Sequence, residues 1–111
     1  MNHVSLVGTV GQYGCKISWT EGGKPQTSLA LVTEEPGKDG VTYKTFIPVL
    51  IVGSRSEEWA ETLEPGDMLA IESGKLAYKL GKTKDSGKLV VVTFNVERLS
   101  GALALLLQSS N

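Results

Sequence analysis

The chain has 111 residues, which is enough for a single domain with its own hydrophobic core. With 11 basic and 12 acidic residues its formal net charge is −1, so overall charge alone indicates no polyanionic partner. The single cysteine, Cys15, excludes an intrachain disulfide framework and is typical of a reducing compartment. Residues 1–3 carry no secretory signal, and the apolar segment 102–107 is too short to span a bilayer, so we expect a soluble cytoplasmic protein with no membrane partner.

The first half of the chain is patterned as three strands. Residues 3–10 alternate apolar and polar positions, and residues 27–33 turn their leucines toward one side. A polar loop at residues 34–40 then leads into a long strand at residues 42–52. The 13 glycines stand at short, spaced positions, which favours many turns and an all-β architecture.

The strand at residues 42–52 is apolar on both faces. Three of its residues share the face that we expect to meet the core: Ile47, Val49 and Ile51. The other face begins with Lys44 and Phe46, a cation and an aromatic ring that need a ligand or a partner chain to cover them. Pro48 removes a ladder donor, which indicates a bulge or a place where the strand changes its pairing.

After Gly53 the hydrophobic period changes to that of a helix. Ser54 and Glu57 match a capping box, in which Ser54 caps the first turn, and the Pro-Gly pair at 65–66 ends the helix. Trp59 lies on the apolar face of this short helix. We therefore expect its ring to anchor the helix to the core rather than to contact a ligand.

The rest of the chain predicts two further strands. The first covers residues 67–80 with a bulge at 73–74, and the second covers residues 89–96. One face of the last strand carries four apolar residues: Val90, Val92, Phe94 and Val96. Three strands, a short helix and two strands are the arrangement of the OB-fold. We predict an all-β, five-stranded OB-fold barrel, with one short helix between strands 3 and 4, over residues 1–100, and a short apolar tail at 101–111.

Four segments carry a resemblance to a known family. Residues 2–8 read Asn-His-Val-Ser-Leu-Val-Gly, the Asn-x-Val-x-Leu-x-Gly pattern that opens bacterial single-stranded DNA-binding proteins. Residues 46–53, 63–67 and 90–96 are similar to that family's third strand, its helix stop and its final strand. The chain resembles this family over about residues 2–99, as a divergent or truncated member, and is also similar to primosomal replication protein B, a dimeric OB-fold relative.

The family binds single strands by stacking bases on aromatic rings and by neutralising phosphates with cations. Here Phe46 stands where the family has a tryptophan, Val52 stands where it has a phenylalanine, and its acidic, phenylalanine-ended tail is absent. The resemblance implies a non-enzymatic, sequence-tolerant single-stranded DNA-binding protein of DNA replication, recombination or repair, and leaves a preference for DNA or RNA open. It also implies a homodimer or homotetramer in which the first strand pairs across a two-fold axis, through Val4, Ser5, Leu6 and Val7.

The strongest local signal is a basic segment at residues 75–88. Five of the 11 basic residues stand there: Lys75, Lys79, Lys82, Lys84 and Lys88. Tyr78 lies among them, and Asp85 is the segment's one acidic residue. Together with Lys44 and Phe46, these residues predict a single-stranded nucleic-acid-binding site. The alternative is that these lysines only keep a hairpin tip soluble and prevent its strand edges from pairing with another chain.

A second hypothesis is an OB-fold protein-interaction module that binds replication proteins and has weak or no affinity for nucleic acid. The near-neutral charge and the missing aromatic residues favour it, and the basic segment argues against it. An enzyme is not indicated, because His3 and Cys15 have no partner at nucleophile or metal-ligand spacing. We expect no catalytic residue, no metal and no cofactor.

Overall fold

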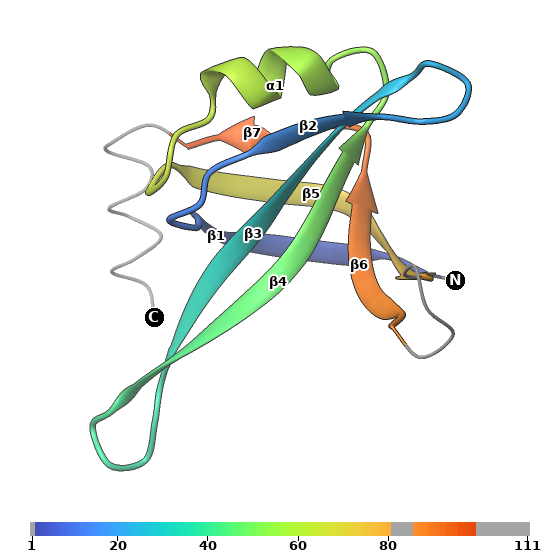
Figure 1. Ribbon diagram of the computed structural model, residues 1–111. Coiled ribbons are helices and arrows are strands. Elements are labelled where there is room, and N and C mark those ends of the chain that lie inside the picture. The colour runs from blue at the N-terminus through green and yellow to red at the C-terminus, as the bar shows by residue number, and fades with distance from the viewer. Residues whose placement is uncertain (1, 81–85, 100–111) are drawn as a thin grey trace.

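The computed structural model describes residues 2–80 and 86–99, which form a closed β-barrel with one short helix (Figure 1). The strands close in the order β1-β3-β4-β6-β5, and β5 returns to pair with β1. This confirms the predicted five-stranded barrel with a helix between the third and fourth barrel strands. The elements of the described residues are β1 (Val4–Val10), β2 (Lys16–Trp19), β3 (Pro25–Pro36), β4 (Thr42–Val52), α1 (Ser56–Thr62), β5 (Met68–Lys79), β6 (Lys88–Thr93) and β7 (Glu97–Arg98).

The core forms where the predicted alternation turns side chains inward. Leu31, Ile51, Leu69 and Ile71 are almost completely buried, and they come from β3, β4 and β5. Burying such side chains fully contributes about 1.5–3 kcal/mol each relative to leaving them exposed. The barrel therefore rests on the alternation in its long strands.

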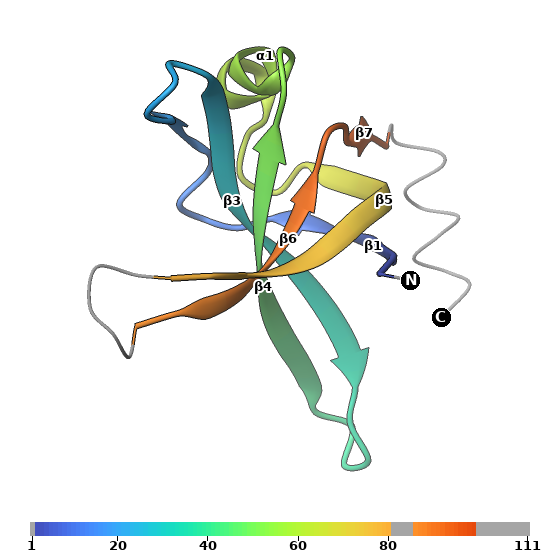
Figure 2. The same ribbon diagram turned by 90° about the vertical axis from the view of Figure 1, so that its right-hand side faces the viewer.

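Strand β4 changes its pairing near Pro48, as the sequence indicated. It pairs with β3 along its whole length in regular antiparallel register, with Pro48 opposite Ala30. It gains a second, parallel partner in β6 only from Val49 onward. The missing N–H of Pro48 thus falls outside the β4–β6 ladder. The part of the β3–β4 hairpin before this point projects from the barrel (Figure 2).

Strand β5 is one bent strand, and its bend lies where the sequence predicted a bulge at 73–74. It pairs with β1 as far as Gly74 and with β6 from Lys75 onward. The register shifts between Val4 and Leu6 of β1, opposite Gly74 and Ile71, which confirms the predicted bulge. Beyond the bend, β5 and β6 form a second hairpin that projects in another direction from the β3–β4 hairpin (Figure 2).

Two short strands were not predicted from the sequence. Strand β2 pairs with β3 from Lys16 to Trp19, in a segment where the sequence predicted no strand. Its four residues are all exposed, so it has no buried alternating face that would mark a strand. Strand β7 is only two residues long, Glu97–Arg98, and pairs with β5. The loop after β3 is also shorter than expected, because β3 continues to Pro36.

The predicted capping box is wrong. The helix begins at Ser56 after Arg55, and no side chain caps its first turn. The buried Ser56 hydroxyl instead donates to the carbonyl of Gly53 at 2.8 Å. The carbonyl of Ser56 accepts a hydrogen bond from the buried Thr27 hydroxyl at 2.6 Å. These two bonds fix the helix start to β3 and leave Ser54 without the predicted role.

Phe94 shares its face with Val90 and Val92, as the sequence predicted, but this face is opposite the one on which Val91 and Thr93 are buried, and 71% of Phe94 is exposed. Strand β6 ends at Thr93, whose buried hydroxyl donates to the carbonyl of Asn95 at 2.9 Å. After this local turn Val96 returns to the core, so Val96 is the residue that departs from the predicted face.

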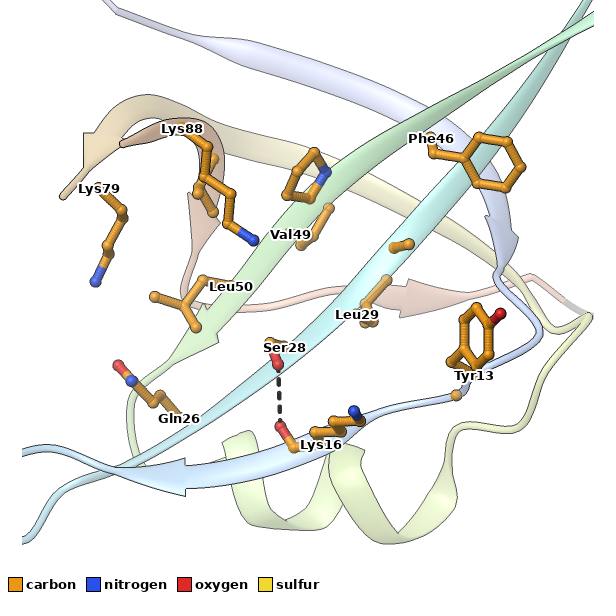
Figure 3. Close-up of a pocket in the computed structure, with 14 residues that line it drawn as sticks. Tyr13, Lys16, Gln26, Ser28, Leu29, Phe46, Val49, Leu50, Lys79 and Lys88 are labelled. Atoms are coloured by element: carbon orange, nitrogen blue, oxygen red, sulfur yellow. Dashed lines mark hydrogen bonds between the residues drawn. The ribbon is translucent and has the colours of Figure 1, made fainter. Parts of the chain in front are cut away.

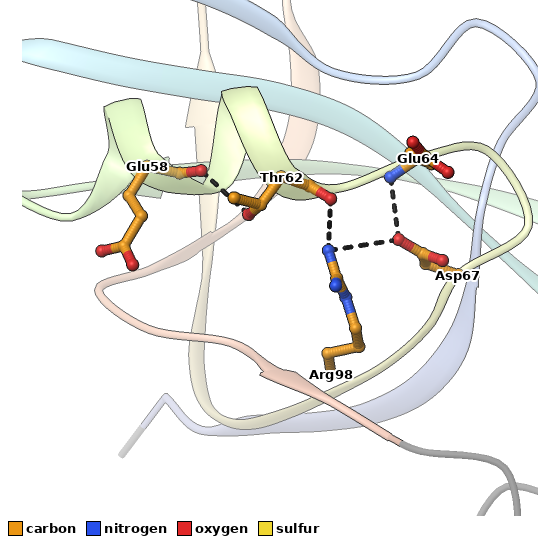
Figure 4. Close-up of polar contacts among 5 residues, drawn as sticks. All are labelled: Glu58, Thr62, Glu64, Asp67 and Arg98. Carbon is orange, nitrogen blue, oxygen red and sulfur yellow. Dashed lines mark hydrogen bonds and ion pairs between the residues drawn. The ribbon is translucent and has the colours of Figure 1, made fainter.

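The helix packs on the barrel through Trp59, as the sequence predicted, and the chain that follows it packs through Leu63. Leu63, just after α1, is buried in the core, and Trp59 packs against it, which confirms the anchor. The far end of α1 is held by Arg98, whose guanidinium donates to the carbonyl of Thr62 and lies 3.4 Å from the Asp67 carboxylate (Figure 4). No helix within the described residues is long and apolar enough to cross a membrane. The predicted tail at 101–111 lies outside the described residues.

Candidate nucleic-acid interface

An open groove of about 400 Å³ runs across the outer face of β3 and β4 (Figure 3). Its floor consists of small or apolar residues of these two strands: Ser28, Leu29, Ala30, Pro48, Val49 and Leu50. The turn before β2 and β2 itself form one side, through Tyr13 and Lys16, and the β5–β6 hairpin forms the other, through Lys79 and Lys88. Among the described residues that line the groove, none is acidic.

Phe46 lies at one end of this groove. It stands on the outer face of β4, as the strand alternation predicts, and 64% of it is exposed. Its cross-strand neighbour on β3 is Val32, so the ring stands on an apolar base. An exposed ring on a rigid strand offers a flat surface on which a planar group can stack.

Lys79 and Lys88 lie at the other end, directly opposite each other on β5 and β6. Side chains of directly opposite residues project from the same face, and like charges at such a pair destabilise a hairpin. Within the described residues neither ammonium forms an ion pair, whereas Lys44, Arg55 and Arg98 do. Bound anions would relieve this repulsion.

Three of the predicted site residues lie outside the groove. Lys44 stands further out on the β3–β4 hairpin and pairs with Glu34, its direct cross-strand neighbour, at 3.8 Å. Lys75 shares its face of β5 with Lys79 but does not line the groove. Tyr78 has the opposite parity, so its side chain lies on the other face of the hairpin, beside Leu89. The predicted residues Lys82 and Lys84 lie outside the described residues.

The predicted interface residues of β1 divide between its two faces. Val4 and Leu6 are half-buried and pack against the core, while Ser5 and Val7 point outward. The Ser5 hydroxyl donates to the carbonyl of Glu72 at 2.9 Å. Strand β1 pairs with β5 over its length but with β3 only at its last two residues. Within the described part of the chain, the first half of β1 thus has a strand on one side only.

The sequence analysis missed the side of the groove that precedes and contains β2. Tyr13 and Lys16 line the groove from this side and Gln26 lines it from β3, and none of the three was predicted. The one usable signal is the glycine pair Gly11 and Gly14, which brackets Tyr13 in a tight turn. Lys16 gave no signal, because its side depends on the pairing of β2 with β3.

Cys15 is half-buried against the core. Burial raises the pKa of its thiol, and the nearby Asp67 carboxylate raises the pKa further. The thiol is therefore protonated at neutral pH and is a poor nucleophile.

No family model matches the sequence, and no curated protein matches it either. Solved structures do match. The wild-type single-stranded DNA-binding protein of Thermus aquaticus is 23% identical with a TM-score of 0.73, and a deletion variant of it is 23% identical with a TM-score of 0.72. Each match covers 91% of this chain and 51% of the other, so the chain spans about half the length of these proteins.

A Plasmodium falciparum single-stranded DNA-binding protein, solved in complex with single-stranded DNA, is 17% identical with a TM-score of 0.72. That match covers 90% of this chain and 96% of the other. The resemblance that the sequence motifs indicated is thus confirmed at the level of the fold. The chain has the OB-type barrel of the single-stranded DNA-binding proteins.

Proposed function

We propose that this chain is a non-enzymatic, sequence-tolerant single-stranded DNA-binding protein of DNA replication, recombination or repair, and that it binds the strand in the groove between Phe46 and Lys79–Lys88. The observation that carries the proposal is the composition of the groove. Within the described residues, three lysines and two exposed aromatic residues line it and no acidic residue does, although the whole chain has a net charge of −1. Charge and rings are thus concentrated on one face, which is the equipment of a single-strand binder.

The two ends of the groove supply the two parts of such binding. At one end, Lys79 and Lys88 would each neutralise a phosphate, and a bound strand would relieve their mutual repulsion. At the other end, Phe46 would stack a base, which contributes about 1–3 kcal/mol. The apolar floor between them has few groups that could distinguish one base from another, so the binding is tolerant of sequence. The Plasmodium falciparum structure of the same fold holds single-stranded DNA, which also supports the proposal.

The test is a salt titration of fluorescence anisotropy with labelled dT and rU oligomers. For single strands, log affinity falls with log salt by about 0.7 per neutralised phosphate. We expect binding at low salt, and Lys79→Ala/Lys88→Ala should weaken it and make the slope shallower by about 1.4. The control is Lys24→Ala/Lys38→Ala, which removes the same charge from two exposed positions outside the groove. Equal losses in both double variants would place the binding site elsewhere.

A protein-interaction module remains the second candidate function. One specific observation favours it: on the face of the β5–β6 hairpin away from the groove, Leu76, Tyr78 and Leu89 are all exposed. Exposed apolar side chains gathered on one face are typical of protein interaction sites. A wild-type chain that binds neither oligomer at low salt would favour this candidate, with a replication protein as its partner.

A further inference from the structure

Tyr13 is the second aromatic residue that lines the groove, beside Phe46. It is 83% exposed, more than any other large hydrophobic residue among those described. It sits in a tight turn in which the N–H of Gly14 donates to the carbonyl of Gly11 at 3.0 Å, and Gly14 adopts a φ of 67° that favours glycine. The turn leaves the ring no place in the core.

The residues before this turn are hydrogen-bonded to β3 and to residues 66–67, and the strand that follows it, β2, pairs with β3. The N–H of Gly11 donates to the carbonyl of Ala30 on β3 at 2.9 Å. Val10, just before Gly11, forms two backbone hydrogen bonds of 2.8 Å: its N–H donates to the carbonyl of Asp67, and its carbonyl accepts from the N–H of Gly66. The backbone that carries Tyr13 is therefore fixed, and little order has to be gained when a ligand binds.

Tyr13 and Phe46 occupy the same end of the groove, from opposite sides of it. Figure 3 shows Phe46 on β4 above the floor and Tyr13 on the turn below it, while Lys79 and Lys88 lie together at the far end. Ala30 and Pro48, which are direct cross-strand partners, belong to the floor. A methyl group and a pyrrolidine ring offer no side-chain hydrogen bond to a base edge.

We propose that Tyr13 and Phe46 hold one unstacked nucleobase between them, with the sugar-phosphate chain leading from it toward Lys79 and Lys88. The inference rests on the proposed function and adds to it a second stacking residue and a direction along the groove. A base enters such a clamp only after it has left its stack, so the clamp selects single strands over duplexes. Two π faces and a methyl-lined floor accept any base, so the clamp adds affinity without adding sequence preference.

The test compares Tyr13→Ala and Tyr13→Phe in the full chain, with a dT oligomer and an abasic oligomer of equal length. Tyr13→Ala should weaken dT binding roughly ten- to a hundredfold, whereas Tyr13→Phe keeps the ring and should bind as the wild type does. Binding of the abasic oligomer, which has phosphates but no bases, should be the same in all three proteins. Melting temperatures should agree, because the side chain is 83% exposed.

A double-mutant cycle with Phe46→Ala then asks whether the two rings hold the same base. A shared base predicts that the double variant loses clearly less than the product of the two single losses. Losses that multiply would show that the rings stack on different bases and would overturn the clamp. Wild-type affinity for dT in Tyr13→Ala would overturn any role for this ring while leaving the proposed function intact. A wild-type chain that binds neither oligomer would refute both.

Discussion

The outer face of β4 is covered either by a ligand or by a partner chain, and Phe46 is the residue for which these two alternatives predict the most different results. If its ring stacks on a base, Phe46→Ala should cost about 1–3 kcal/mol of binding, roughly ten- to a hundredfold. The melting temperature should hardly change, because 64% of the residue is exposed. Anisotropy with dT oligomers and a thermal melt measure the two quantities on the same sample. A loss of about 3–5 kcal/mol of stability with normal binding per folded molecule would show that the ring is packed in a subunit interface.

Lys44 illustrates how a neighbour decides what a charged residue does. Its ammonium is paired with Glu34 at 3.8 Å, on the same face of the hairpin as Phe46. Glu34→Gln removes the competing carboxylate, so we expect tighter binding of dT oligomers and a salt slope that is steeper by about 0.7. The matched control is Glu35→Gln, one residue along β3 on the opposite face, where the cross-strand partner is Tyr43. An equal gain in both variants would mean that only net charge matters.

At the residue scale, the sequence predicted what depends on alternation within a strand and missed what depends on strand pairing. The outward direction of Phe46 follows from its parity with Ile47, which needs no tertiary information. The ion pair of Lys44 was missed because Glu34 stood in a segment expected to be a loop, which the structure shows to be the end of β3. Tyr78 was grouped with Lys79 by proximity in sequence, but adjacent residues of a strand point to opposite faces.

At the scale of elements, the bend of β5 at Gly74 positions the hairpin that carries Lys79 and Lys88. A Cβ at Gly74 would lie 2.7 Å from Cγ1 of Val91 and 3.2 Å from the carbonyl oxygen of Val4. Gly74→Ala should therefore lower stability by about 1–3 kcal/mol through overpacking, measured by denaturant unfolding. It should also weaken dT binding at temperatures where the protein stays folded, since the hairpin shifts relative to the groove.

The control for Gly74→Ala is Gly22→Ala. A Cβ at Gly22 would meet no atom closer than the Thr20 hydroxyl at 3.9 Å, so this variant should be close to neutral. If Gly74→Ala is as stable as Gly22→Ala, the bend does not depend on the absence of a side chain, and Val91 has room to move.

The bulge at this bend was predictable because a Ser-Gly pair interrupts an otherwise regular strand pattern. The start of the helix was not, because a capping box is a local pattern that competes with tertiary hydrogen bonds. Here the bond from Thr27 to the carbonyl of Ser56 and the bond from Ser56 to the carbonyl of Gly53 fix the first turn. Strand β2 was missed for a related reason: with four exposed residues, it is held by its backbone pairing with β3 rather than by a buried face.

At the scale of the whole molecule, the open edge of β1 argues for assembly. The first half of β1 pairs with β5 alone, within the described residues, and Val7 on its outer face is 46% exposed. An unpaired strand edge with apolar side chains is a ready surface for a second copy of the chain. We therefore expect a homodimer or homotetramer. Light scattering at micromolar concentration should give a mass two or four times the 11.8 kDa of one chain.

Val7→Glu tests where the copies meet. A carboxylate at the centre of a two-fold contact would face its own copy, so the mass should fall toward 11.8 kDa while the melting transition remains cooperative. Ile17→Glu is the matched control, because Ile17 is 43% exposed and lies on β2, which pairs with β3. It should leave the assembly intact. A wild-type mass of one chain would end the proposal of assembly, and dissociation by Ile17→Glu alone would move the interface from β1 to β2.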